Sequence, residues 1–325
     1  MGQRPTSSAR FGPWGASTAG ATSEWSTVIL ILSNTEAGSA DADRLREVAA
    51  ELGTEADVAF CSGSGDLDKA LDTCEGHDTL VVAGGDGSLH ALANVLHRRG
   101  ELGERAVGLL PMGTGNDFAR TLGMPLEPFA AAAALRAATE RPLDLIVDNA
   151  GEVTVNAVHL GVGAESTRAA SRWKRLLGPA SFPVGGVIAG LAARGYRLRV
   201  VADGEVLIDT DHKALMVGLS NGRYIGGGTG RLAPDALLDD GLLHLVVSRS
   251  RGFTKRAVHA VRLHRGTHPL EVDVHHRRVH QVTVTGERCA ASADGELKEN
   301  VTGRTWRVLP AAWRFLVPPE EDGPA

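Results

Sequence analysis

The chain is poor in aromatic residues and cysteines, and it has no long apolar run. Aromatic residues make up 4% of its 325 residues, whereas glycine occurs 40 times, which predicts aliphatic cores with many tight turns. Cys61, Cys74 and Cys289 form no C-x-x-C pair, so neither a disulfide framework nor a zinc knuckle is expected, and a reducing cytoplasm fits. A net charge of −5 argues against a general nucleic-acid binder. No segment is long and apolar enough to span a bilayer, so any membrane contact should be peripheral.

The composition changes along the chain and divides it into four parts. Residues 1–24 are rich in small and polar residues, and we expect a disordered extension there. Residues 25–148 alternate strand and helix patterns, which predicts an α/β domain with a parallel sheet and helices on both faces. Residues 149–317 contain short apolar stretches between Gly, Asp and Asn turns, which predicts a β-rich, sandwich-like domain. Residues 318–325 are expected to form a flexible tail, and the last strand before it is a candidate to pack back on the first domain.

Two of the expected elements are long. The segment that begins at Asn116 and runs through the alanines up to Ala134 has a helical pattern, with Asn116 and Asp117 suited to cap its start. The segment Val153–Leu160 has the pattern of one continuous strand.

The most informative feature is a pair of glycine-rich turns about one helix apart. Ala83–Ser88 follows the apolar run Thr79–Val82, and Pro111–Asp117 follows the apolar run Val107–Leu110. Ligands of open α/β sheets bind outside the carboxyl ends of the strands, where glycine lets backbone N–H groups approach phosphate oxygens. The two turns therefore predict a phosphate-binding site, although each alone is also compatible with a tight strand-to-helix connection.

The first turn also carries a carboxylate, Asp86. A carboxylate beside a triphosphate repels it unless a cation lies between them, and Mg²⁺ is a suitable bridge. Neither turn ends in Gly-Lys-Ser/Thr, so the P-loop signature is absent.

The order of the motifs resembles that of the diacylglycerol kinase catalytic family. The resemblance is to its soluble bacterial lipid kinase branch, which is related to sphingosine kinases and more distantly to NAD kinases, and it extends from about Val28 to Val317. The motifs that carry it are Gly84–Ser88, Pro111–Arg120, Asn156 with Gly161–Glu165, Gly226–Gly228 through Pro234–Leu242, and Asp294–Glu296.

The resemblance implies an NAD kinase-like first domain and assigns roles to individual residues. The ATP phosphates and ribose would be held by Gly84, Gly85, Asp86, Gly87 and Ser88 in the first loop, and by Gly113, Thr114, Asn116 and Asp117 in the second. Asp86 would lie near Mg²⁺. Glu296 of the Asp-Gly-Glu turn would be the base on the lipid hydroxyl, with Asp294 supporting the metal or water network, which fits the needs of phosphoryl transfer.

A second magnesium, with a structural role, is also implied by the resemblance. Its ligands would be the backbone carbonyls of Leu237 and Leu242 and the carboxylate of Asp240. Mg²⁺ accepts such oxygen ligands readily. Asp240-Gly241 is equally compatible with a tight turn that binds no metal.

The expected function is therefore ATP-dependent phosphorylation of a lipid hydroxyl, with diacylglycerol as the expected acceptor and phosphatidic acid as the product. ATP and Mg²⁺ are the expected cofactors, the lipid is met at the membrane surface, and the enzyme is cytoplasmic or peripheral at the inner face. The sequence leaves open whether the chain forms a homodimer. The basic, Trp-containing stretch 168–175 suits an anionic membrane surface, but a solvated helix face is at least as good an interpretation.

Two alternatives remain open. The first is an NAD kinase, which shares the Gly-Gly-Asp-Gly loop. The second is a catalytically silent nucleotide- or lipid-binding module, because His90 and Ala91 stand where many relatives carry Asn-Glu, and Cys61 stands where a nucleotide-contacting Thr is common. The histidines between His259 and His280 do not have the spacing of a metal site.

Overall fold

The computed structural model describes most of both predicted domains. The described residues are 28–34, 39–53, 55–73, 77–161, 164, 195–249, 252–268 and 273–319. The predicted extension 1–24, the basic stretch 168–175 and the tail beyond residue 319 lie outside them.

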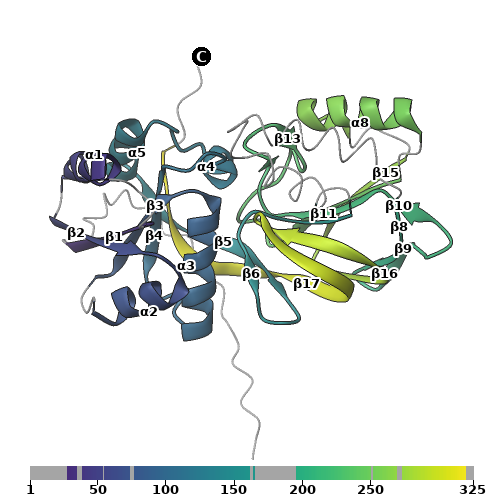
Figure 1. The fold of residues 1–325 in the computed structure, drawn as a ribbon, viewed down its shortest axis with the longest axis horizontal. Helices are drawn as coiled ribbons and strands as arrows, with labels where there is room; N and C mark the ends of the chain where they lie inside the picture. The colour runs from purple at the N-terminus through teal and green to yellow at the C-terminus, as the bar shows by residue number, and fades with distance from the viewer. Residues whose placement is uncertain are drawn as a thin grey trace, which may run out of the picture.

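The N-terminal domain is a parallel sheet covered by helices on both faces (Figure 1). Its strands lie in the order β2 (Glu55–Cys61), β1 (Val28–Asn34), β3 (Thr79–Gly84) and β4 (Ala106–Pro111). Helices α1 (Ser39–Ala50) and α5 (Pro128–Arg136) lie on one face, and α2 (Ser64–Thr73) and α3 (Asp86–Arg99) on the other. Because both faces are covered, the strands are continuous apolar runs, and residues 80–83 are all buried.

The last strand joins the two domains. β17 (Glu296–Val317) pairs antiparallel with β16 (Gln281–Ala293) at its start and with β5 (Thr139–Asp148) farther along. Near its end it pairs parallel with β4 of the first domain, through Arg314 opposite Ala106 and Phe315 opposite Val107. Phe315 packs edge-on against Phe118 with ring centroids 5.3 Å apart. One sheet therefore runs through the whole molecule and fixes the domains relative to each other.

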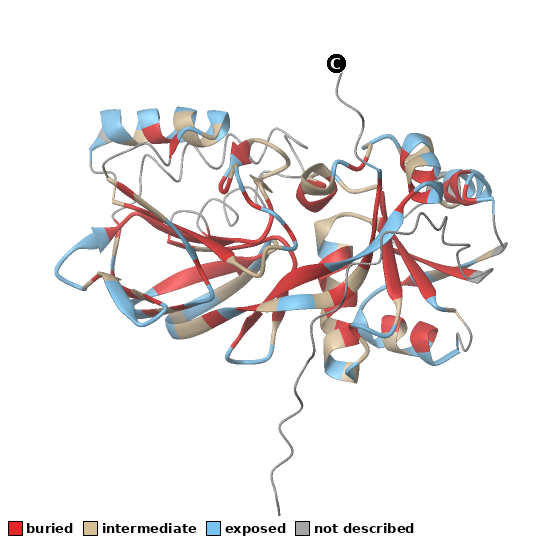
Figure 2. Ribbon diagram, turned by 180° about the vertical axis from the view of Figure 1, so that it is seen from behind, coloured by how far each residue is buried: buried red, intermediate tan, exposed pale blue. Residues whose placement is uncertain are grey.

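The C-terminal domain is a β-sandwich-like unit, as predicted. One layer contains β7 (Ala157–Gly161), β11 (Met216–Ser220), β14 (Leu243–Ser248) and β15 (Val274–Val279), and the other contains β8 (Tyr196–Ala202) and β9 (Glu205–Ile208). β16 serves both layers, because a register shift after Thr285 lets its first half pair with β8 and its second half with β7. The apolar side chains between the layers are buried (Figure 2).

The remaining elements are short or peripheral. They are α4 (Asp117–Leu122), β6 (Val153–Thr154), β10 (Lys213–Ala214), β12 (Tyr224–Ile225), β13 (Gly230–Arg231) and α8 (Phe253–Arg265). Helix α8 lies along the outer face of the layer that contains β14 and β15 (Figure 1).

Two predicted elements are wrong in their extent. The long helix from Asn116 to Ala134 is two helices, because Gly123 adopts φ 74° and ends α4, and α5 restarts at Pro128 with the Glu127 side chain accepting from the Ala130 N–H at 2.9 Å. The single strand Val153–Leu160 is interrupted between β6 and β7, where the backbone bonds to a side chain of a distant hairpin instead of a neighbouring strand.

Candidate active site

A cleft of about 760 Å³ lies between the two domains. One wall is formed by the two glycine loops and the other by β7, the end of β16 and the hairpin that leads into β17. Four carboxylates line it, those of Asp86, Asp117, Asp294 and Glu296, and none of the described lining residues is Lys or Arg.

The two glycine loops touch each other through their backbones. A Cβ atom on Gly113 would lie 2.5 Å from the Cα of Gly85, so a larger residue cannot be accommodated there without moving a loop. The Met112 N–H donates to the Gly84 carbonyl at 3.0 Å and extends the pairing of β3 and β4 into the loops. The absence of side chains at this contact lets both loops present backbone to the cleft.

The Asp86 carboxylate ties the first loop to the second. Its two oxygens accept from the backbone N–H groups of Asp117 and Phe118, each at 3.0 Å, and these are the first two residues of α4. A carboxylate at this position satisfies amides that have no partner within the helix and interacts favourably with the helix dipole. Burial, followed by the charge of Asp117, nevertheless raises the pKa of Asp86 to about 6.

Asp117 extends the same arrangement to the C-terminal domain. Its carboxylate accepts from the N–H groups of Gly227 at 2.9 Å and Gly228 at 2.6 Å, two glycines with φ of 72° and 79° between β12 and β13. Burial raises the pKa of Asp117. The three glycine segments of the sequence are thus joined, through Asp86 and then Asp117, along one side of the cleft.

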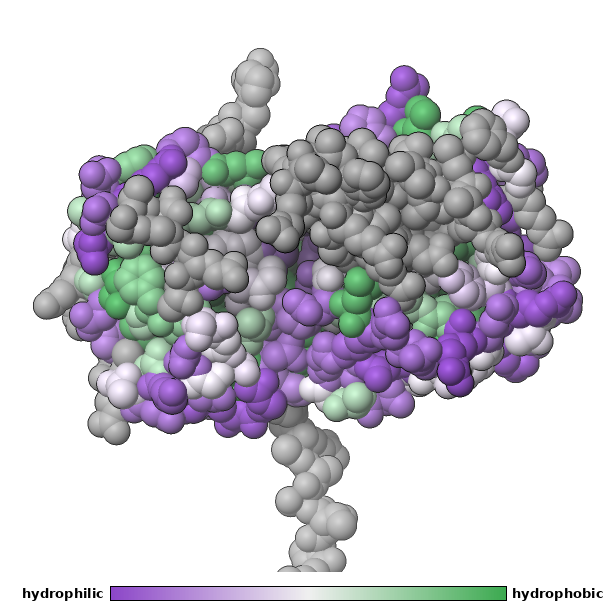
Figure 3. All heavy atoms as spheres, viewed as in Figure 1, coloured by the Kyte–Doolittle hydropathy of each residue, from purple (hydrophilic) through white to green (hydrophobic). Residues whose placement is uncertain are grey.

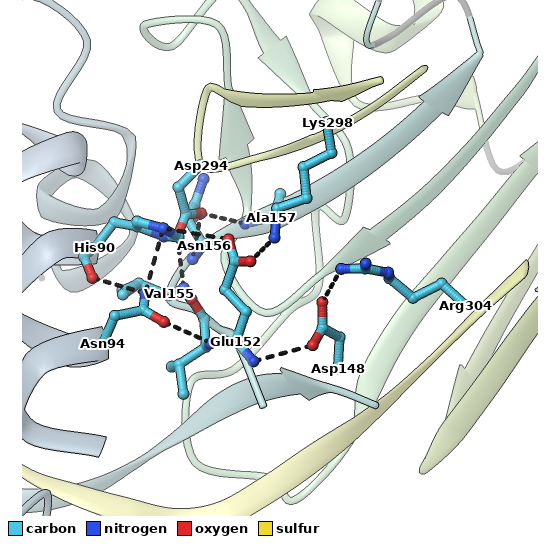
Figure 4. Close-up of polar contacts among 11 residues, drawn as sticks. His90, Asn94, Asp148, Glu152, Val155, Asn156, Ala157, Asp294, Lys298 and Arg304 are labelled. Atoms are coloured by element: carbon cyan, nitrogen blue, oxygen red, sulfur yellow. Dashed lines mark hydrogen bonds and ion pairs between the residues drawn. The ribbon is translucent and has the colours of Figure 1, made fainter. Parts of the chain in front are cut away.

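Asp294 is the most heavily bonded side chain of the site. It adopts φ 47° at the turn between β16 and β17, and its carboxylate accepts from the N–H groups of Val155 (2.7 Å), Asn156 (2.9 Å) and Ala157 (3.0 Å). His90 of α3 lies with Nδ1 2.9 Å from the same carboxylate (Figure 4). These four contacts interrupt the strand between β6 and β7 and attach the hairpin to both the sheet and α3.

A second set of contacts surrounds Asp294. His90 Nε2 lies 3.2 Å from Asn94 Nδ2 and 3.8 Å from a Glu152 oxygen, and Glu152 pairs with Lys298 of β17 (Figure 4). Burial lowers the pKa of Lys298. Asn94 also exchanges two hydrogen bonds with the backbone of Val153, at 2.8 and 2.9 Å. The hairpin is therefore held on one side by α3 and on the other by an ion pair.

Glu296 is exposed to the cleft, two residues after Asp294. No described residue forms a hydrogen bond with its carboxylate, in contrast to the three buried carboxylates. His159 of β7 also lines the cleft, and burial lowers its pKa to about 4, so the imidazole is neutral at physiological pH. The C-terminal wall thus offers one free carboxylate beside neutral polar groups.

The other residues named from the sequence occupy different places. Ser88, Gly87 and Thr114 line the cleft, together with Ala91 and Cys61. Gly84 and Asn116 lie behind the lining, and the Asn116 amide donates to the Gly113 carbonyl at 2.7 Å and shapes the second loop. Asn116 begins α4 in the left-handed conformation, φ 52°, so its side chain does not cap the helix as the sequence predicts.

Sequence reasoning missed the residues that hold the hairpin. Asn94, Glu152 and Lys298 come from three separate segments and have no motif of their own. His90 was recognised only as a departure from the family pattern, and its contact with Asp294 spans 204 positions of the chain.

The predicted structural magnesium site is a closed turn in this structure. The Asp240 carboxylate accepts from the Leu242 N–H at 3.0 Å, and the Gly241 N–H donates to Asp144 at 2.7 Å. Leu237 is exposed. Magnesium at Leu237, Asp240 and Leu242 stays a prediction.

The main cleft is acidic, although no three His, Cys, Asp or Glu side chains of the described residues form a group there that could hold a metal. The charged groups that line it, among the described residues, are all carboxylates, and a triphosphate placed there needs positive charge to offset them. Asp294 is occupied by four donors, whereas Glu296 is free and each oxygen of Asp86 accepts only one hydrogen bond.

Comparison with known proteins identifies the family. Residues 28–147 match the diacylglycerol kinase catalytic domain, and residues 156–317 match the YegS C-terminal NAD kinase beta sandwich-like domain. The chain belongs to the diacylglycerol kinase family, in its YegS-like lipid kinase branch. This confirms the resemblance found in the sequence, and it favours a lipid kinase over an NAD kinase.

Individual relatives agree with this assignment. A protein of Pseudomonas aeruginosa strain PAO1 named "Probable lipid kinase YegS-like" is 36% identical over 223 residues, which cover 68% of this chain and 71% of the relative. A protein of Stenotrophomonas maltophilia with the same name is 34% identical over 232 residues, covering 67% and 72%.

Solved structures share the fold. The crystal structure of a diacylglycerol kinase from Bacillus anthracis superimposes with a TM-score of 0.71 at 24% identity and covers 91% of this chain and 99% of that one. A second structure from the same organism gives a TM-score of 0.74 at 22% identity. Within the described part of this chain, no helix has the length and apolarity needed to cross a membrane.

Proposed function

We propose that this protein is an ATP-dependent lipid kinase that phosphorylates the free hydroxyl of diacylglycerol and yields phosphatidic acid. The observation that carries the proposal is the contrast among the four carboxylates of the cleft. Asp117 and the Asp294 side chain are buried, Asp86 is half-buried, and all three are bonded to backbone amides, whereas Glu296 is exposed and has no such partner. A single free carboxylate opposite a phosphate-binding wall is the arrangement that phosphoryl transfer to an alcohol requires.

Each wall has a distinct part in the reaction. Backbone N–H groups of the two glycine loops bind the phosphate oxygens of ATP. Glu296 accepts the proton of the lipid hydroxyl while the hydroxyl oxygen forms a bond to the γ-phosphorus. The bond from that phosphorus to the β–γ bridging oxygen breaks, and ADP leaves with the electron pair. Asp294 orients Glu296 by fixing the hairpin, since its carboxylate already has four partners.

Mg²⁺ is part of the proposal. Asp86 is the residue that would lie beside it, since each of its oxygens accepts only one hydrogen bond, and the bound ion would neutralise charge on the phosphates. Support comes from the lack of Lys and Arg among the described residues that line the cleft.

The proposal is tested with the purified protein and γ-³²P-labelled ATP, supplied with diacylglycerol, sphingosine, phosphatidylglycerol or NAD in parallel. We expect labelled phosphatidic acid, and no product when magnesium is removed with a chelator. Labelled NADP would revive the NAD kinase alternative. If ATP binds and no acceptor is labelled, the catalytically silent module is the better description.

The silent-module alternative rests on Cys61, His90 and Ala91, which differ from the residues that many relatives carry at these positions. The structure gives His90 a role. His90 contacts Asp294 at 2.9 Å and so takes part in holding the hairpin that carries Glu296. A residue that organises the proposed catalytic hairpin supports an active enzyme more than a silent one.

A further inference from the structure

Positive charge is concentrated in one segment of this acidic chain. Residues 249–280 contain eight Lys and Arg and two Asp and Glu, a net formal charge of +6 in a chain whose total is −5. Helix α8 (Phe253–Arg265) lies at the centre of this segment and contains four basic residues and no acidic one. Such asymmetry favours interaction with an anionic surface.

The exposed face of α8 combines this charge with apolar side chains. Lys255, Val258, Arg262 and Arg265 are spaced by three or four residues, which places them on one stripe of the helix, with Val261 beside it. Val258 and Val261 are 44% and 51% exposed, Arg265 is exposed and Arg262 is half-buried. The Lys255 side chain is 64% exposed, although its ammonium group pairs with Asp273. In Figure 3, hydrophilic and hydrophobic atoms alternate along the edge of the C-terminal domain where Figure 1 places α8.

The opposite face of α8 accounts for its attachment to the protein. His259 is buried, and Leu263 packs on the small apolar cluster of Met216, Leu232, Val246 and Val274. In the stripe, Lys255 pairs with Asp273 at 2.6 Å, whereas Val258 and the neighbouring Val261 lie outside the buried core. Apolar side chains between basic ones on an exposed helix are the pattern of helices that lie in the interface of an anionic bilayer.

The helix is also connected to the cleft. His264 Nδ1 lies 2.7 Å from the Thr229 carbonyl oxygen, and α8 packs against β13, which begins at Gly230. The loop before this strand contains Gly227 and Gly228, which bond to Asp117 of the nucleotide wall. A membrane surface in contact with α8 would therefore be separated from the cleft by only the β12–β13 hairpin.

We propose that α8 is the membrane-docking element of this enzyme, with Lys255, Arg262 and Arg265 contacting anionic lipid headgroups and Val258 and Val261 entering the interface. The proposal rests on the lipid kinase function proposed above, because a kinase whose acceptor is a membrane lipid must reach the bilayer. The net charge of the segment, opposite in sign to that of anionic lipid, commits the surface to a bilayer over other partners.

The test measures binding to vesicles without ATP. The full chain is sedimented with vesicles of phosphatidylcholine alone or with 30% phosphatidylglycerol, at low and high salt. The test variant is Lys255→Gln/Arg262→Gln/Arg265→Gln, and the matched control Arg44→Gln/Arg46→Gln/Arg98→Gln changes net charge equally on exposed helices of the other domain. We expect salt-sensitive binding to anionic vesicles only, weakened about 100-fold by the α8 variant and less than about threefold by the control.

A second measurement does not depend on the variants folding correctly. Hydrogen exchange of the wild-type protein should slow within residues 253–265 when anionic vesicles are added. The proposal is overturned if the wild type does not bind anionic vesicles, or if the α8 variant binds them as well as the wild type does. It is also overturned if the control variant loses as much binding, or if hydrogen exchange in α8 does not slow. A change from dimer to monomer in the α8 variant without a change in vesicle binding would overturn it too, and would assign this face to a second copy.

Activity measurements separate this proposal from the proposed function. With water-soluble dioctanoylglycerol the α8 variant should keep its kcat, whereas with diacylglycerol in anionic vesicles its rate should fall with its binding. If the wild type phosphorylates lipid and the α8 variant still binds vesicles, only the docking proposal fails. If α8 binds vesicles and no lipid is labelled, only the kinase proposal fails.

Discussion

The two walls of the cleft present different chemical groups to it. The N-terminal wall presents backbone, because Gly85 and Gly113 pack against each other without side chains and the carboxylates of Asp86 and Asp117 are engaged by amides. The C-terminal wall presents side chains, above all the free carboxylate of Glu296. Backbone N–H groups suit phosphate binding, whereas proton transfer needs a titratable group. The proposed function thereby assigns binding and chemistry to different domains.

Buried carboxylates hold both walls in place. Asp86 and Asp117 fix the loops of the first wall, and Asp294 fixes the hairpin of the second. Each accepts from backbone amides whose own partners in helix or strand are missing, so these acidic residues of the cleft are largely structural. Substitutions can therefore distinguish residues that shape a wall from those that act at its surface.

The largest expected effect is on the stability of the second wall. Asp294→Ala should lower the free energy of unfolding by about 3–5 kcal/mol, because four donors, among them the amides of Val155, Asn156 and Ala157, lose their buried acceptor. Urea unfolding measures this, with the exposed Asp211→Ala as control. A loss below about 1 kcal/mol would mean that the hairpin is held by something else.

The next prediction concerns the pH dependence of the first wall. Burial raises the pKa of Asp86 from 3.8 to about 6, so the folded state holds the proton more tightly than the unfolded chain. The stability gained from this is fully present below about pH 4 and lost as pH rises through 6. Relative to Asp86→Asn, the wild type should lose about 2–3 kcal/mol between pH 4 and 7. A difference that is constant or grows with pH contradicts the assignment.

A smaller effect is expected at the contact between the glycine loops. In Gly113→Ala the new methyl group would lie 2.5 Å from the Gly85 Cα, so one loop must move. We expect a loss of about 1–3 kcal/mol in stability and a higher KM for ATP. Gly103→Ala is the control, since no atom lies within 4 Å of its Cβ. Equal effects at both positions would show that loop packing is unimportant.

The smallest expected effect on stability is that of Gly87→Ala, which distinguishes the packing of this glycine from its role in letting a ligand approach. Gly87 lies in α3 at the cleft and a Cβ there meets nothing within 4 Å. Gly87→Ala should therefore raise stability by about 0.5–1 kcal/mol through helix propensity, while the methyl group obstructs phosphate and raises the KM for ATP about tenfold. An unchanged KM would show that phosphates do not approach this residue.

Much of the fold could be predicted because its signals are local. The apolar runs before the glycine turns indicate β3 and β4, and glycine followed by an amphipathic segment indicates α3. Helix α8 was missed although its apolar and basic residues have a helical spacing, because it lies between segments with strand patterns in the half of the chain predicted to be β-rich. The predicted helix beginning at Asn116 is too long, because the alanine run favours helix and the sequence pattern does not show that α4 ends at Gly123.

The motifs of the site could be predicted from the sequence, but the hydrogen-bond partners of its residues could not. Gly84–Ser88 and Asp294–Glu296 are recognisable in sequence, but nothing in either indicates that Asp294 bonds to Val155 and His90, since such contacts depend on how the chain folds. For the same reason Asp86 was expected near a metal, and its capping of α4 was not foreseen. Sequence identifies the polar residues of a buried network more readily than their partners.

The division of labour between the walls is tested most directly by Glu296→Gln. Calorimetric titration with Mg-ATP and steady-state assay with diacylglycerol are carried out on this variant and on the exposed control Glu205→Gln. We predict that Glu296→Gln binds Mg-ATP within about threefold of the wild type while kcat falls about 10²–10⁴-fold, as expected for loss of a general base. A variant that keeps its kcat, or that loses nucleotide affinity in proportion to kcat, contradicts the account.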